Sequence, residues 1–157
     1  MGEESYDAAV KVYALYGAFF NKVAKELGKQ KALALHREAH EIMGVETGKK
    51  LKEQMGDREC DLKTLAEILR KSNVSIGIDS QMVEGPGSLL LRNARCPMYD
   101  GYRMSGLDDG TAEDLCQVGA PAKLGSTLKE LNPKISYRLT HYRDRPTDRC
   151  EEEVSLQ

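Results

Sequence analysis

The sequence predicts an α+β fold in which N-terminal helices pack on an antiparallel sheet built from two hairpins with a helix between them. In the first 72 residues, apolar side chains recur at the three- and four-residue spacing of amphipathic helices. Two later segments alternate apolar and polar residues on either side of turn-forming sequences, which indicates hairpins. Helices and strands are partly segregated along the chain, which favours α+β. We expect one domain over 1–157, with a helical part at 1–72 and a hairpin-helix-hairpin part at 73–157.

The composition is that of a folded protein of ordinary charge. Of the 157 residues, 40% are hydrophobic, and 23 basic side chains stand against 25 acidic ones. Such a chain is too apolar for disorder, and its charge balance argues against a nucleic-acid binder. No apolar run reaches the roughly 18 residues of a membrane-spanning helix, and the acidic N-terminus does not begin like a signal peptide. We therefore expect a cytoplasmic protein that binds neither nucleic acid nor membrane.

Three helices are expected in the first part of the chain. The helix at 5–27 has an unusually broad apolar face, because the stretch 8–20 carries a single charge. This face belongs in a core or against a partner. The helix at 29–55 contains two glycines four residues apart, which allow a kink or a close helix contact. The third helix spans 61–72, with Asp61 as its N-cap.

The first hairpin follows these helices. Alternation of apolar residues over 74–78 indicates a strand, and the sequence Gly-Pro-Gly at 85–87 is a turn signal. The return strand spans 88–96. A turn centred on its proline predicts that Met82 lies opposite Leu90.

A helix and a second hairpin complete the chain. Thr111 and Asp114 resemble a capping box at the start of the helix, and after an interruption a second helical piece spans 123–131. In the last hairpin, the alternation of apolar residues and a turn between positions 145 and 146 predict that His141 lies opposite Cys150.

Four side chains could form a metal site. We expect Cys96 on the inner face of the first hairpin, Cys116 on the following helix, and His141 and Cys150 opposite each other in the second hairpin. Directly opposed residues have Cβ atoms about 4.5–5.5 Å apart, close enough to share a tetrahedral ion. Such ligands suit zinc, whereas an iron–sulfur cluster is less favoured because no closely spaced run of cysteines is present. Alternatively, these cysteines pack as small hydrophobic side chains.

Other polar side chains could line a ligand pocket. His36 and His40 lie four residues apart on one helix face, either at the boundary of the core or in a pocket. The HExxH motif of metalloproteases is not present. Tyr99 and Tyr102 belong to a polar-aromatic segment, expected as a loop, that lines a pocket or is solvated. Arg95 could hold a carboxylate, although arginines are also common on exposed strands.

At Arg95-Cys96-Pro97, at Cys116 and at Asp148-Arg149-Cys150-Glu151, the chain resembles the L-2-amino-thiazoline-4-carboxylic acid hydrolase-like family. That family is in turn similar to 4-vinyl-reductase-type small-molecule-binding domains. The resemblance implies an α+β ligand-binding fold that is often a homodimer through its N-terminal helices. The named hydrolase opens a cyclic thiazoline.

The resemblance also implies a zinc site, in a modified form. Cys116 and Cys150 match two zinc-binding cysteines of the 4-vinyl-reductase-type domains. The third cysteine has no equivalent, and His141 stands close to its place, while Cys96 could be a fourth ligand. The carboxylate ligand has no clear match, because Leu139 falls near its position. This departure bears on the metal and leaves the expected fold unchanged.

Three functions are compatible with these features. The first is hydrolysis of a small cyclic C–N-bonded carboxylate substrate, with a metal-bound water or the Cys96 thiolate as nucleophile and with Arg95 holding the carboxylate. The second is a non-catalytic small-molecule-binding or sensory module with a structural metal or thiol cluster. The third is an interaction protein in which the first two helices dimerise. We favour the first, and the sequence leaves turnover itself open.

Overall fold

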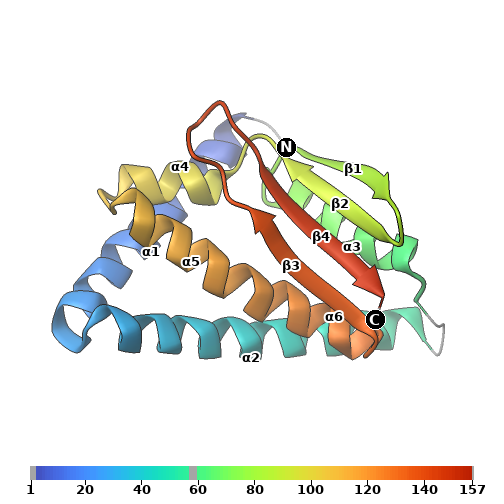
Figure 1. The fold of residues 1–157 in the computed structure, drawn as a ribbon. Coiled ribbons are helices and arrows are strands. Elements are labelled where there is room, and N and C mark those ends of the chain that lie inside the picture. Colours follow the sequence, from blue (N-terminus) through green and yellow to red (C-terminus); the bar gives the residue numbers. More distant parts are fainter. Residues whose placement is uncertain (1–2, 57–59, 157) are drawn as a thin grey trace.

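The computed structural model describes residues 3–56 and 60–156, and it is an α+β fold (Figure 1). The helical elements are α1 (Glu3–Leu27), α2 (Lys29–Met55), α3 (Leu62–Ser75), α4 (Pro97–Met104), α5 (Asp109–Ala120), the π-helical turn η1 (Pro121–Gly125) and α6 (Ser126–Leu131). The strands are β1 (Ser80–Gly85), β2 (Ser88–Asn93), β3 (Ile135–His141) and β4 (Cys150–Leu156). They form one antiparallel sheet in the order β1-β2-β4-β3. The predicted fold class is confirmed.

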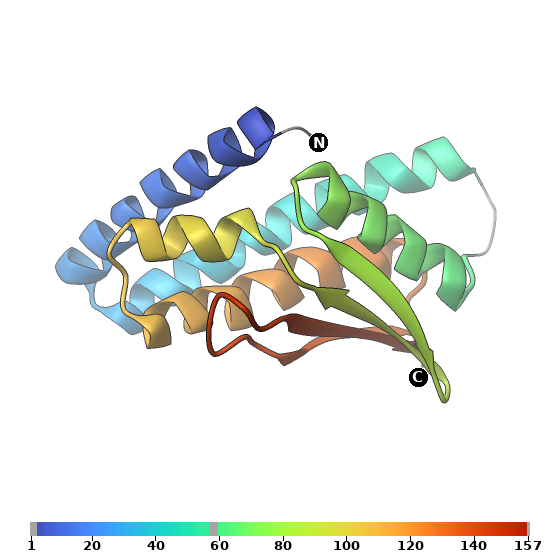
Figure 2. The ribbon, with the colours of Figure 1, turned by 90° about the horizontal axis from the view of Figure 1, so that it is seen from above.

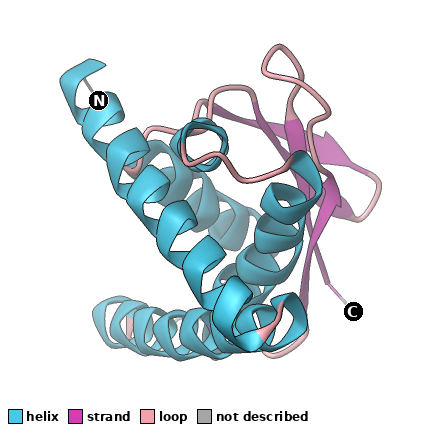
Figure 3. Cartoon of the chain, turned by 90° about the vertical axis from the view of Figure 1, so that its left-hand side faces the viewer, coloured by secondary structure: helices cyan, strands magenta, loops and turns pink. Residues whose placement is uncertain are grey.

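The described helices lie to one side of the sheet, as Figures 2 and 3 show from two directions. The long helix α2 packs along α5, η1 and α6, and α1 packs on α4. Helix α3 covers β1 and β2. Within the described residues, no helix is long and apolar enough to cross a membrane.

The main core lies between α3, α6 and the sheet. Leu65, Leu69, Leu91, Leu128 and Val154 are almost completely buried there, and they come from four different elements. Burying a side chain of this size contributes about 1.5–3 kcal/mol, so this cluster holds the helices on the sheet.

The start of the first hairpin differs from the prediction. Helix α3 continues to Ser75, so it takes residues that were expected in a strand, and β1 begins only at Ser80. The turn has two central residues, Pro86 and Gly87, and Gly87 adopts a φ of 70° that favours glycine. Met82 therefore lies opposite Leu91, one position from its predicted partner.

The segment after β2 is the helix α4, where a loop was predicted. Pro97 stands in its first turn, where the missing backbone N–H breaks no hydrogen bond. Tyr99 and Tyr102 are three residues apart on α4, and both are buried. Their spacing and the leading proline were the available signals for this helix.

The helix between the hairpins runs almost without a break from α5 to α6. Its N-cap is Asp108, whose carboxylate accepts a hydrogen bond from the Thr111 amide at 2.9 Å, so the predicted capping box is wrong. Pro121 cannot donate a backbone hydrogen bond, and the helix widens into a π-helical turn there before continuing. The predicted close helix contact is present at Gly44, where an added Cβ would lie 2.3 Å from the Lys123 carbonyl oxygen.

The second hairpin follows its predicted register only in part. Tyr137 lies opposite Val154 as predicted, and the same register holds as far as Leu139. A bulge then inserts one residue into β3, and His141 lies opposite Glu151. Because successive side chains of β4 point to opposite faces, His141 and Cys150 lie on opposite faces of the sheet. The predicted pairing of His141 with Cys150 is therefore wrong.

Candidate functional site

A cavity of about 90 Å³ lies where the helices meet the sheet. Its lining combines apolar walls with titratable and polar groups that are far apart in the sequence. The polar lining residues are Tyr13, His36, His40, Ser72, Asn73, Tyr102, Cys116, Lys123 and Glu152. A small cavity with a few convergent polar groups suits a compact ligand.

His36 is fixed in one tautomer by two hydrogen bonds. Its Nε2 lies 2.9 Å from the Leu115 carbonyl oxygen, which can only accept, so Nε2 carries the proton. Its Nδ1 then accepts from the Tyr16 hydroxyl at 2.6 Å. Burial, together with the neighbouring His40, lowers the pKa of His36 to about 4. The ring is therefore neutral near pH 7. Gly119 makes room for it, since an added Cβ would lie 2.4 Å from Nε2.

His40 has one ring nitrogen available to a ligand. Its Nδ1 lies 2.8 Å from the His36 carbonyl oxygen and must donate to it. Among the described residues, none forms a hydrogen bond with its Nε2. Burial, with a smaller effect from the Lys123 ammonium, lowers the pKa of His40. A neutral ring protonated at Nδ1 leaves the Nε2 lone pair free to accept a proton.

Glu152 contributes a buried carboxyl group to the same cavity. It lies on β4, is 6% exposed, and accepts a hydrogen bond from the Asn73 amide nitrogen at 3.0 Å. Burial raises the pKa of Glu152. In the sequence, Glu152 is the middle residue of a run of three glutamates, a pattern typical of a solvated strand end. Alternation along β4 was the missed signal, because it places Glu152 on the same inner face as Cys150 and Val154.

Three of the predicted metal ligands lie near one another, and the fourth does not. Burial raises the pKa of Cys116 well above its usual value and that of Cys96 to about 12. A negative charge on Cys150 would raise both pKa values further, because its sulfur lies close enough to repel the other two thiolates. His141 lies on the other sheet face and bonds through Nε2 to Asp148 at 3.0 Å. In the described part of the chain, no three His, Cys, Asp or Glu side chains are grouped so as to hold a metal ion. The predicted four-ligand zinc site is therefore not assembled.

Of the remaining predicted site residues, Tyr102 lines the cavity, and Tyr99 and Arg95 lie outside its lining. Tyr102 lines the cavity beside the two histidines. Tyr99 instead packs in a small core with Cys96, and the buried Arg143 guanidinium lies 4.9 Å from its ring. Arg95 forms an ion pair with Glu3 and stacks on Tyr6 near the start of α1, away from the cavity lining.

The family model for L-2-amino-thiazoline-4-carboxylic acid hydrolase matches residues 8–151. The chain belongs to this family. The fold is also similar to that of a trafficking protein particle complex subunit 3 from Naegleria fowleri covalently bound to palmitic acid. That similarity has a TM-score of 0.60 at 13% identity and covers 96% of this chain and 95% of the other. Comparison with curated protein sequences finds no match.

Proposed function

We propose that the protein hydrolyses a small cyclic C–N-bonded carboxylate substrate, similar to the thiazoline in its family's name, in the cavity that contains His40 and Glu152. One observation carries this proposal. Burial shifts the two pKa values in opposite directions, keeping the histidine unprotonated and favouring the protonated carboxyl group. A base and an acid that face one cavity are what hydrolysis of a carbon–nitrogen bond requires.

The roles follow from the protonation states. His40 Nε2 removes a proton from water as the water oxygen bonds to the ring carbon of the C=N group, and Glu152 donates a proton to the ring nitrogen. The Glu152 carboxylate then takes the proton of the new hydroxyl group, and a C=O bond forms as the ring C–N bond breaks. The electron pair of the broken C–N bond stays on the nitrogen, which receives a proton from His40. Both side chains return to their starting states, and one water has been consumed.

Two further groups suit such a substrate. The Lys123 ammonium is the cation of the cavity lining and would hold the substrate carboxylate. Tyr13 and Tyr102, whose rings meet edge to face with centroids 6.3 Å apart, form a wall for a flat ring. Cys96 and Arg95, to which the sequence assigned catalysis, do not line the cavity and have no role in this proposal.

The test is turnover of L-2-amino-thiazoline-4-carboxylic acid by the purified chain, followed by mass spectrometry of the ring-opened product. We expect His40→Gln and Glu152→Gln each to lower kcat by about 10²-fold or more. Lys123→Met should act mainly by raising KM. His141→Gln, which removes a histidine outside the cavity, is the matched control and should keep full activity. Ring opening that survives both the His40 and Glu152 changes would overturn the proposal.

A second candidate is a module that binds an apolar ligand without turnover. The observation that favours it is the similar fold of a protein that is covalently bound to palmitic acid. Product formation distinguishes the hydrolase from the binding module. Tight binding of a thiazoline or acyl ligand with no product formed would support the module and exclude the hydrolase.

A further inference from the structure

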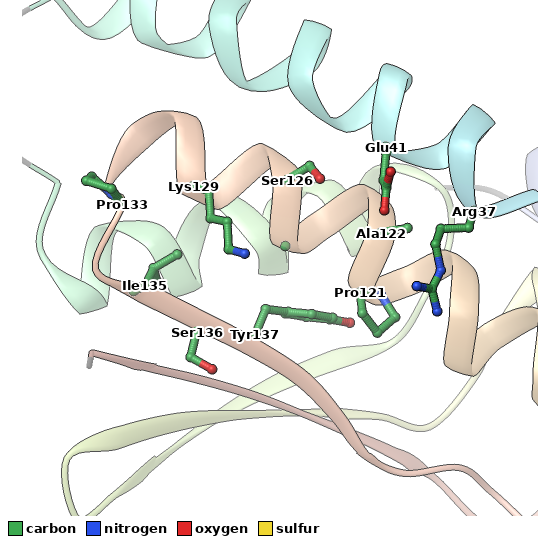
Figure 4. A pocket seen from close by; sticks show the side chains of 11 residues that line it. Arg37, Glu41, Pro121, Ala122, Ser126, Lys129, Pro133, Ile135, Ser136 and Tyr137 are labelled. Atoms are coloured by element: carbon green, nitrogen blue, oxygen red, sulfur yellow. The ribbon is translucent and has the colours of Figure 1, made fainter. Parts of the chain in front are cut away.

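A second hollow, a groove of about 460 Å³, lies outside the proposed active site and shares no lining residue with it. Figure 4 shows its three sides. Residues of η1 and α6 form the floor, Arg37 and Glu41 of α2 form one wall, and the start of β3 forms the other. We propose that this groove binds an extended acidic peptide segment of a partner protein, which adds a strand to the sheet beside β3.

The wall formed by β3 offers backbone hydrogen bonds. The sheet order places β3 at an edge, and its only strand partner among the described residues is β4. Every second backbone N–H and C=O of an edge strand points away from the sheet and is available to an incoming strand. The lining residues Ile135, Ser136 and Tyr137 belong to this strand, so its edge borders the groove. Strand addition is a common way of binding extended peptides.

Small side chains form the floor of the groove and leave its volume open. Ala122, Gly125 and Ser126 are spaced so that they lie on one face of the helix, and all three line the groove. An ideal Cβ built on Gly125 meets no atom within 4 Å. A larger side chain at Gly125 would therefore project into the groove without striking the chain itself, which gives a direct way to fill it.

The charges on the groove select the chemistry of the peptide. Arg37 and Lys129 are both exposed, and within the described residues neither forms an ion pair. Glu41 stands one helical turn from Arg37 and is likewise without an ion-pair partner there. Two cations against one carboxylate favour an acidic peptide. The Glu41 carboxylate repels an acidic residue at the peptide position next to it, which helps to fix the register of the peptide in the groove.

The test uses the full chain, labelled with ¹⁵N, and two synthetic octapeptides that alternate valine with glutamate or valine with lysine. We expect the acidic peptide to shift the amide signals of 135–139 and 122–129, with binding that weakens as salt is raised, and the basic peptide to leave them unchanged. Gly125→Leu and the double change Arg37→Glu with Lys129→Glu should each abolish these shifts. Lys11→Glu, an exposed charge reversal on α1, which contributes no residue to the groove lining, is the matched control and should not.

Gly125→Leu fills the groove, whereas the double change of Arg37 and Lys129 reverses its charge. If one of these variants fails to fold, the other still tests the proposal. Unchanged spectra with the acidic peptide would overturn the proposal, and so would equal binding of both peptides. Shifts confined to the signals of His40 and its neighbours would assign the peptide to the hydrolase cavity instead. A doubling of mass in light scattering that Gly125→Leu abolishes would show that a second copy occupies the groove, and this too would overturn it.

Discussion

The buried histidine His36 makes the stability of this protein depend on pH in a defined direction. The ring is held neutral because burial, together with the neighbouring His40, disfavours the charged form by more than the hydrogen bond to the Leu115 carbonyl oxygen favours it. In the unfolded chain the same ring titrates near 6.5. The unfolded state therefore binds more protons than the folded state between these two pKa values, and acid favours unfolding.

The size of the effect follows from the pKa shift. Lowering the pKa of His36 from 6.5 to about 4 corresponds to about 3 kcal/mol, at 1.36 kcal/mol for each unit. This stability is fully present above pH 6.5 and is lost as the pH falls toward 4. His40, whose pKa is also lowered, adds to the loss. Glu152 opposes this loss of stability. Because its pKa is raised by burial, the folded state binds its proton at a higher pH than the unfolded state does, and acid favours folding at this group.

The assay is urea unfolding followed by circular dichroism, repeated between about pH 7.5 and pH 4.5. His36→Gln removes one titrating group and leaves His40 and Glu152 in place, so the difference between the two curves isolates His36. We expect the original chain to lose most of the roughly 3 kcal/mol more than the variant over this range. Parallel curves, or a His36 ring that titrates near 6.5 in NMR spectra of the folded protein, would refute this account of the site.

Three other predictions concern the core, a helix end and the surface. Leu128→Ala should lower the free energy of unfolding by about 3 kcal/mol, against about 0.5 kcal/mol for Met104→Ala at a site that is 66% exposed, and equal losses in urea unfolding would contradict the described core. Asp108→Ala should cost about 1 kcal/mol in the same measurement, whereas Asp108→Asn keeps the cap and should cost little. We also propose a homodimer through the exposed apolar face of α1 and α2. Light scattering should then show the mass halved by Phe19→Glu, and a monomeric parent chain would exclude it.

Much of the fold follows from patterns that are local in the sequence. Helices α1 and α3 follow from apolar periodicity, whereas α2 buries mainly small residues and His36 and leaves Leu35, Ile42 and Met43 exposed. The Asp61 cap is confirmed, because its carboxylate accepts a hydrogen bond from the Thr64 amide at 2.7 Å. Most of the second hairpin register follows from alternation. The family is indicated by three short motifs. Each of these signals is carried by residues close together in the chain, where propensity and hydrogen bonding of neighbours decide the structure.

The tertiary structure alone determined the site. His40 comes from α2 and Glu152 from β4, and no local pattern shows that they share a cavity with Cys116. One bulge in β3 moved His141 to the other sheet face and removed the metal site that spacing had suggested. Strand side chains alternate between faces, so a single inserted residue reverses which groups meet. The packing of distant segments, with the burial it imposes, sets which groups meet and how their pKa values shift.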